Sequence, residues 1–121
     1  MSLSIAQLEK GLPTSQESEK VVLGSILLDD SRYPDVAGTL SADDFSIEKH
    51  RRIFRRMAEL HGRGEAIDKI TVYSELQKAG EAESCDGLSY LSELDNGLPL
   101  LPNVDAYVRI VVEKSTLRRC I

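Results

Sequence analysis

The sequence predicts an all-α fold, a compact bundle of six or seven short helices with a longer C-terminal helix. Apolar residues recur at three- and four-residue steps along most of the 121 residues. Helix-capping residues, Gly and Pro divide these periodic segments at short intervals. The sequence shows no alternating strand pattern, internal repeat or low-complexity tract. Its length and its 41% hydrophobic content suit one aliphatic core.

The first helix is predicted to follow a capping box formed by Thr14-Ser15-Gln16-Glu17. Residues 1–12 are expected to be a tag or a flexible segment, and the domain is expected to occupy residues 13–121. The helix should span about 14 residues, a common length in globular proteins. Its apolar residues are Val22, Leu23, Ile26 and Leu27. Asp29-Asp30-Ser31 should end it, and a short helix is expected around residues 33–40.

The clearest helix is predicted over residues 46–63, with Ser46 as its cap and Gly62-Arg63-Gly64 as its end. A second cap, Ser41-Ala42-Asp43-Asp44, precedes it. One face carries a core stripe at three- and four-residue steps. That stripe comprises Ile47, His50, Ile53, Phe54, Met57 and Leu60 or His61. The opposite face carries Arg52, Arg55, Arg56, Glu48 and Glu59.

Two further short helices are predicted in the second half of the chain. Asp68 or Thr71 should cap the first, which contains Val72, Leu76 and Ala79 and ends at Gly80. The second contains Leu88, Leu91 and Leu94 and ends at Asn96-Gly97.

The terminal helix, residues 102–121, is predicted to carry two apolar stripes. Asn103 suits its N-cap, and the first stripe is Val104, Val108 and Val111. The second stripe is Tyr107, Ile110, Leu117 and Ile121. Because a surface helix of a small domain normally has one apolar stripe, the second is a candidate protomer interface. No Gly or Pro closes the helix, so the chain is expected to be part of a longer one.

Several classes of function find no support in the sequence. It lacks the phosphate-binding G-x-x-x-x-G-K-[ST] loop and the H-E-x-x-H and G-x-S-x-G motifs, so no catalytic, cofactor or metal site is expected. No apolar run approaches the roughly 20 residues that span a membrane. The N-terminus has no basic segment followed by an apolar one, so it is not expected to be a signal peptide. The protein is therefore expected in the cytoplasm without a membrane partner. Cys85 and Cys120 are expected to be reduced thiols.

Two polar patterns have structural interpretations. His50 and His61 lie on one helical stripe but about 16 Å apart along the axis, too far to share a metal. Both are expected to be histidines at the edge of the core. The acid pairs Asp29-Asp30 and Asp43-Asp44 fall at helix ends, where turn and cap roles are expected.

A local basic face is a stronger candidate for a binding site than the histidines or the acid pairs. The net charge is −5, yet residues 46–64 carry six basic and two acidic side chains. Arg52, Arg55 and Arg56 form the candidate partner-docking face. One interpretation is a solvated surface paired with Glu48 and Glu59, and the other is docking of an acidic protein or a few phosphates. The acidic balance and the lack of interleaved aromatics predict weak or indirect DNA contact.

A series of ordered motifs resembles the N-terminal domain of DnaB-type replicative helicases. The series begins with Glu17-x-Glu19-x-x-Val22-Leu23-Gly24-Ser25-Ile26-Leu27-Leu28-Asp29, Leu40-Ser41-x-x-Asp44-Phe45, His50-x-x-Ile53-Phe54 and Gly64-Glu65-x-Ile67-Asp68. It continues with Thr71-Val72, Gly87-Leu88-x-Tyr90-Leu91, Asn103-x-x-x-Tyr107-x-x-Ile110-Val111-x-Glu113-Lys114 and Leu117-Arg118-Arg119-x-Ile121. The resemblance covers residues 13–121. One departure is Leu100-Leu101-Pro102, where the family has small residues.

The resemblance implies a helical collar domain on a hexameric helicase ring that helps to receive primase. It also implies that the terminal helix continues into a hairpin that pairs protomers, so this chain is truncated within that hairpin. ATP and Mg are expected in a separate ATPase domain. The interpretation is a non-catalytic assembly and docking domain that binds itself, as a weak dimer in isolation and a hexamer in the parent protein. Primase is an expected partner, and a helicase loader is a further candidate.

The alternative is a small free-standing helical module that binds DNA or protein through the basic face of residues 46–63.

Overall fold

The computed structural model describes residues 15–96, 98 and 103–119, and within them it contains six α-helices and no strand. The α-helices are α2 (Ser15–Leu28), α3 (Tyr33–Ala37), α4 (Glu48–Gly62), α5 (Lys69–Lys78), α6 (Gly87–Asp95) and α7 (Val104–Arg119). Two 3-10 helices, η1 (Asp30–Arg32) and η2 (Ala42–Asp44), join them. The predicted all-α class is confirmed. The expected segment 1–12, the Thr14 cap, the loop 100–102 and Ile121 lie outside the described residues.

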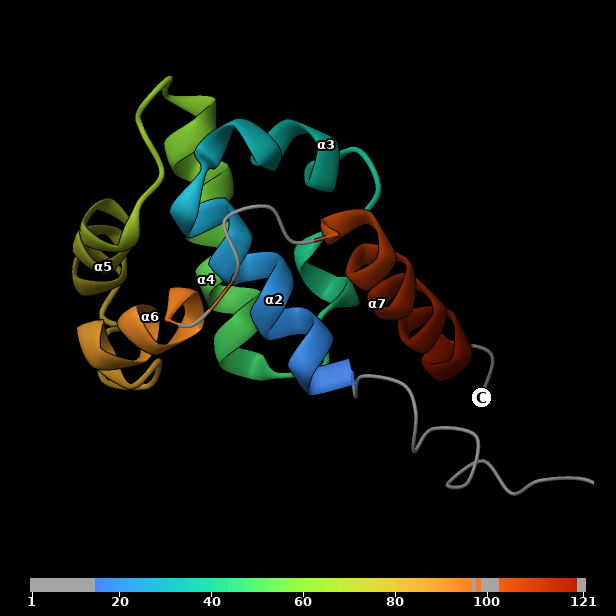
Figure 1. The fold of residues 1–121 in the computed structure, drawn as a ribbon. Helices are drawn as coiled ribbons and strands as arrows, with labels where there is room; N and C mark the ends of the chain where they lie inside the picture. Colours follow the sequence, from blue (N-terminus) through green and yellow to red (C-terminus); the bar gives the residue numbers. More distant parts are fainter. Residues whose placement is uncertain (1–14, 97, 99–102, 120–121) are drawn as a thin grey trace, which may run out of the picture.

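Helix α2 crosses the centre of the molecule and contacts α4, α6 and α7 (Figure 1). In this view α5 and α6 lie on one side of α2, and α7 lies on the other. Val22, Leu23 and Ile26 of α2 are completely buried. A helix covered on several sides must be apolar over most of its surface, which explains why most residues in its second half are apolar.

The contact between α2 and α6 depends on Gly24. A Cβ atom at this position would lie 2.1 Å from the carbonyl oxygen of Leu94 and 2.8 Å from its carbonyl carbon. Because both are backbone atoms, no side-chain rotation could relieve the overlap. The absence of a side chain at Gly24 therefore sets the distance between the two helices.

The start of α4 differs from the prediction that Ser46 is its cap. The helix begins at Glu48 with Ile47 in the N-cap position. Ser46 instead donates hydrogen bonds from its backbone N–H and its hydroxyl to Oε2 of Glu19, at 2.8 and 2.5 Å. The N–H of Ile47 faces Oε1 of the same carboxylate at 3.4 Å. A buried acid of α2 thus takes the acceptor role that a local serine was expected to have.

The caps of the later helices follow the sequence more closely. Asp68 accepts hydrogen bonds from the N–H groups of Ile70 and Thr71, at 2.9 and 2.8 Å. The hydroxyl of Thr71 accepts from the N–H of Asp68 at 2.9 Å, which completes a capping box. Of the two residues proposed, Asp68 is the N-cap. Helix α6 follows Asp86, whose φ of 62° places it in the left-handed region.

One member of each acid pair has the predicted cap role, and the other member has a different partner. Asp29 accepts from the N–H of Ser31 at 3.1 Å and caps η1. Asp30 accepts from the N–H of Ile67 at 2.9 Å, so it also joins η1 to the segment before α5. Asp44 accepts from the N–H of Ser41 at 2.8 Å in a capping box around η2.

A continuous run of rings passes through the core. From the exposed end of α4 it follows the order His61, Tyr33, Phe54, Phe45, His50 and Tyr90. Neighbouring centroids lie 4.8, 5.5, 5.1, 6.5 and 5.9 Å apart. These are the distances of tilted, edge-on and stacked ring pairs. The run connects α3 to α6 through α4.

Across the described ranges, no helix combines the length and the apolar character that crossing a bilayer requires.

Candidate partner-binding surfaces

A buried polar network joins the three central helices beneath the candidate surfaces. Nδ1 of His50 lies 2.8 Å from Oε1 of Glu19, and Nε2 lies 2.6 Å from the hydroxyl of Tyr90. The side chains of His50 and Glu19 are fully buried. The prediction that His50 lies at the edge of the core is therefore wrong, because α2 and α6 cover it from both sides. His61 lies at the exposed end of α4.

The protonation of this network follows from its geometry. Burial raises the pKa of Glu19, but hydrogen bonds from His50 and Ser46 outweigh burial and bring the pKa below its ordinary value. An ionised carboxylate can only accept, so Nδ1 of His50 carries the proton between them. Burial raises the pKa of Tyr90 to about 12, so its hydroxyl remains a donor to Nε2. The network is a satisfied cross-link of α2, α4 and α6.

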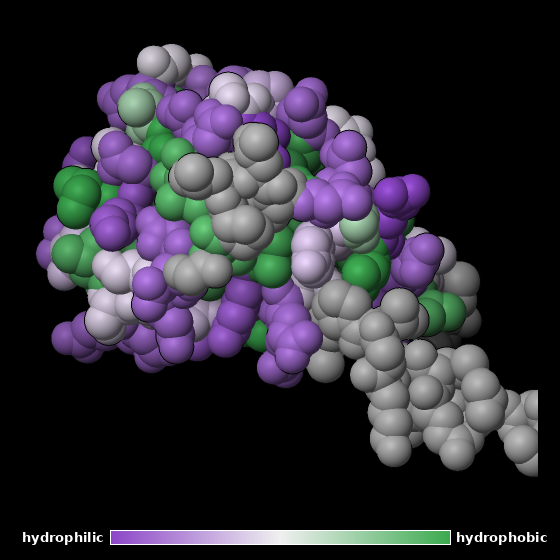
Figure 2. Space-filling model, in the orientation of Figure 1, coloured by the Kyte–Doolittle hydropathy of each residue, from purple (hydrophilic) through white to green (hydrophobic). Residues whose placement is uncertain are grey.

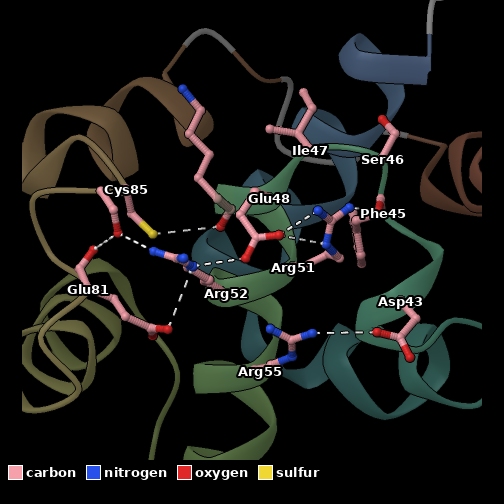
Figure 3. Close-up of polar contacts among 12 residues, drawn as sticks. Asp43, Phe45, Ser46, Ile47, Glu48, Arg51, Arg52, Arg55, Glu81 and Cys85 are labelled. Atoms are coloured by element: carbon pink, nitrogen blue, oxygen red, sulfur yellow. Dashed lines mark hydrogen bonds and ion pairs between the residues drawn. The ribbon is translucent and has the colours of Figure 1, made fainter.

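Each of the three arginines of the candidate docking face has an acidic neighbour, and Figure 3 shows those of Arg52 and Arg55. Nε of Arg52 lies 3.0 Å from Glu48, and its guanidinium also donates to Ser84. The Arg55 guanidinium lies 3.5 Å from Asp43, and the Arg56 guanidinium lies 2.9 Å from Glu59. Arg52 and Arg56 each approach Glu81 at 3.7 Å.

Exposure distinguishes these arginines. The side chain of Arg55 is 44% exposed, against 30% for Arg52 and 19% for Arg56. The ion pair of Arg55 with Asp43, at 3.5 Å, is also longer than the shortest ion pair of either neighbour. Since exposed pairs of this kind contribute little, Arg55 can exchange Asp43 for an external acid at small cost. The sequence indicated Glu48 and Glu59 as partners but not Glu81 or Ser84, which come from a distant loop.

The first apolar stripe of α7 is buried as predicted. Val104, Val108 and Val111 pack into the core beside α2, and Ser115 continues the row one turn later. The second stripe is divided. Tyr107 is half-buried and packs against the core. Ile110 is half-buried as well, Leu117 is 60% exposed, and Ile121 lies outside the described residues.

A shallow groove of about 400 Å³ lies beside the exposed part of that stripe. It is lined by Val112, Glu113, Thr116 and Leu117. Val112 was not among the predicted interface residues, because it belongs to neither of the two apolar stripes. Its position one turn before Thr116 is the feature of the sequence that could have indicated it. Figure 2 shows hydrophobic side chains interrupting the hydrophilic surface over α7. Of the predicted interface residues that the structure describes, Leu117 lines this groove, and Tyr107 and Ile110 do not.

A second hollow, of about 470 Å³, is lined by Lys20, Lys49, Asp86, Ser89, Tyr90 and Glu93. Lys49 already has two partners there, Asp86 at 2.9 Å and the ring of Tyr90 at 3.8 Å. Over residues 15–96, 98 and 103–119, no group of three or more His, Cys, Asp or Glu is placed to hold a metal ion. Cys85 is a buried free thiol whose pKa is raised by burial.

Comparison with known sequences assigns most of the chain to one family. The sequence model of the DnaB-like helicase N terminal domain matches residues 11–113. The replicative DNA helicase DnaB of Geobacillus stearothermophilus is 42% identical over 109 residues, which cover 90% of this chain and 24% of that protein. The replicative DNA helicase DnaC of Bacillus subtilis is 40% identical with the same coverage. The chain spans about a quarter of the length of these relatives.

Solved structures agree with the sequence comparison. The N-terminal domain of DnaB helicase from Mycobacterium tuberculosis matches with a TM-score of 0.80 and 36% identity, over 84% of this chain and 73% of that one. The corresponding Helicobacter pylori domain matches with a TM-score of 0.76 over 98% of this chain and 89% of that one. At 19% identity the second comparison concerns the fold alone. From its sequence and its helical architecture, this chain belongs to the family of DnaB-like helicase N-terminal domains.

Proposed function

We propose that the chain is a non-catalytic assembly and partner-docking domain of a hexameric replicative DNA helicase. In this role it supports ring formation and receives primase during DNA replication, while ATP and Mg bind in a separate domain of the parent protein. The observation that carries the proposal is the outer surface of α7. Leu117 is 60% exposed beside a groove, although α7 already buries a complete apolar stripe on α2.

Self-association is the first part of this function. The proposed interface consists of Tyr107, Ile110, Leu117 and Ile121, to which the structure adds Val112 as a groove residue. Tyr107 and Val112 contribute less, because both side chains already pack against the core. Burial of a few aliphatic side chains yields about 25 cal/mol per Å², most of which association costs offset. The isolated chain should therefore form a weak two-fold dimer.

Sedimentation of a double variant tests self-association. Ile110→Asp with Leu117→Asp should shift the chain to monomer without unfolding it, because both side chains lie outside the buried stripe. Arg109→Asp, an exposed site on the same helix, is the matched control and should sediment like the parent. A parent chain that remains monomeric at hundreds of micromolar would contradict the proposed interface. Unfolding of the double variant would instead place these residues in the core.

Partner docking is the second part of the function. The H. pylori domain is described together with its interactions with primase, and the fold is shared. On this chain we assign docking of primase or a helicase loader to Arg52, Arg55 and Arg56. The exposure of Arg55 supports the assignment. All three arginines already pair with acids of this chain, so a partner must present acids of its own that replace them.

Charge reversal tests the docking face. Changing all three arginines to Glu should weaken primase binding and reduce its salt dependence, and Arg55→Glu alone should produce the largest single effect. Lys78→Glu is the control, since Lys78 is 70% exposed and lies on α5. Unchanged affinity in the triple variant would leave the face as solvated surface.

Titration with single-stranded DNA at modest salt tests the alternative, a free-standing nucleic-acid-binding module. That alternative predicts that the parent chain binds the DNA and that the variant with all three arginines changed to Glu does not.

A further inference from the structure

Asp44 of η2 contacts three residues in the last turn of α7. Its Oδ1 accepts a hydrogen bond of 2.6 Å from the hydroxyl of Ser115 and one of 2.9 Å from the guanidinium of Arg119. Its backbone carbonyl accepts a hydrogen bond of 2.8 Å from Arg118. More than seventy residues of sequence separate these groups, so the contacts are tertiary.

The Asp44 carboxylate is itself held in place by its own turn. Oδ2 accepts from the backbone N–H of Ser41 at 2.8 Å and from its hydroxyl at 3.2 Å. Oδ2 thus fixes the rotamer of the Asp44 side chain, and Oδ1 faces α7. The Asp44 side chain is 13% exposed, and its most enclosed partner is Ser115, which is 2% exposed.

The contacts with Asp44 begin where the apolar packing of α7 ends. Val111 is completely buried and Ser115 is 2% exposed. Thr116, Leu117, Arg118 and Arg119 are all exposed. The last turn therefore has a polar attachment where apolar burial no longer holds it. Leu117 and Thr116 of the groove belong to this same turn.

We propose that Asp44 is a positioning residue that fixes the direction in which the last turn of α7 leaves the domain. Through Ser115 and Arg119 it presents Leu117 and the groove at a set angle to the core. Without the Asp44 carboxylate, the last turn of α7 would still carry Leu117 but would lose its fixed orientation relative to the core. The consequence for assembly rests on the proposed function, whereas the orientation itself does not.

Two sets of variants separate positioning from folding. Asp44→Ala removes the acceptor, and Asp43→Ala is the matched control on the adjacent residue, which is 78% exposed and contacts Arg55. Because Asp44→Ala also removes the capping box of η2, Ser115→Ala with Arg119→Gln is the second variant. It breaks the two contacts of the Asp44 carboxylate with α7 and leaves Ser41, Asp44 and the Arg118 contact intact.

The readout is the set of backbone amide residual dipolar couplings, measured by NMR on the full chain. In Asp44→Ala and in the Ser115–Arg119 variant, the couplings of residues 115–119 should shrink or change, while those of residues 104–111 stay as in the parent. Asp43→Ala should leave both groups unchanged. A general loss of stability would lower the melting temperature without altering the couplings of folded molecules. Unchanged couplings for residues 115–119 in the Ser115–Arg119 variant would overturn the proposal, even if Asp44→Ala fails to fold.

Sedimentation of the same variants tests the link to assembly. If Asp44 positions the interface, the self-association of the parent should weaken in the Ser115–Arg119 variant and persist in Asp43→Ala. Equal association of the parent and that variant would overturn the link. A monomeric parent would contradict the proposed interface, and the couplings would still decide whether Asp44 orients α7.

Discussion

The carboxylate of Glu19 on α2 lies 2.8 Å from Nδ1 of His50 on α4, and neither side chain is exposed to solvent. The same carboxylate accepts hydrogen bonds from Ser46 at the start of α4. One acid of α2 therefore both anchors and orients α4, the helix that carries the candidate docking face. Its replacement should affect the whole domain.

Glu19→Gln should lower the free energy of unfolding by about 2–3 kcal/mol, because it removes the charge from buried hydrogen bonds and leaves His50 with a weaker acceptor. Urea denaturation monitored by circular dichroism measures the change. Glu83→Gln, at an exposed position, is the control and should stay within about 0.5 kcal/mol of the parent. A parent-like midpoint for Glu19→Gln would show that the network adds no net stability.

Stability should fall in acid because of the same carboxylate. The pKa of Glu19 is lower in the folded chain than its ordinary value of 4.5, and the pKa of Asp44 is lowered from 3.8. For Asp44, burial raises the pKa, but hydrogen bonds from Ser115 and Ser41 outweigh it. As pH falls, the unfolded chain therefore binds protons before the folded chain does. The two carboxylates contribute their full stabilisation above their ordinary pKa values, and this contribution is lost as pH falls through their pKa values in the folded chain. Urea midpoints measured from neutral pH downward should decline below pH 4.5, and less steeply in Glu19→Gln.

Gly24→Ala should destabilise the domain by about 3 kcal/mol or more, because the new methyl group would overlap the backbone of Leu94 and force α2 away from α6. The same change normally stabilises a helix interior by up to about 1 kcal/mol. Gly62→Ala is the matched control, since nothing lies within 4 Å of its added Cβ. Equal thermal midpoints for the two variants would mean that the helices separate without cost.

Tyr90→Phe should cost about 1–2 kcal/mol, since it leaves Nε2 of His50 without a partner in a buried site. Tyr73→Phe is the control, because the Tyr73 hydroxyl contacts Gln77 in an exposed setting.

Tyr90→Phe also tests how the stability of the domain changes at high pH. With the Tyr90 pKa raised from 10.0 to about 12, the fold favours the neutral phenol, and stability should fall as pH rises through this interval. Ultraviolet titration of Tyr90→Phe should lack part of the late-ionising signal that the parent shows.

Helix positions could be predicted from the sequence because their signals are local. The spacing of Val104, Val108 and Val111 defined the buried side of α7, and Asp68 with Thr71 defined the start of α5. These signals operate within one or two helical turns, which is the range that periodicity and capping describe.

The features that the sequence did not reveal depend on residues far apart in the chain. Ser46 was expected to cap α4, but Glu19, 27 residues earlier, supplies the acceptor. His50 was expected at the edge of the core, but α2 and α6 enclose it. Arg52 and Arg56 formed a face by spacing alone, whereas their approach to Glu81 required the loop after α5 to fold back. Such pairings follow from tertiary packing, which no local pattern encodes.

The run of rings through the core has an optical consequence. The chain has no tryptophan, so its four tyrosines dominate its near-ultraviolet absorption and its fluorescence. Tyr33 packs at a tilt against the exposed His61, and Tyr90 stacks on the buried His50. Each end of the run thus carries its own chromophore, one beside solvent-exposed imidazole and one beside enclosed imidazole. Single Tyr→Phe substitutions at the two ends would let the loosening of α3 and that of α6 be followed separately, with no added dye.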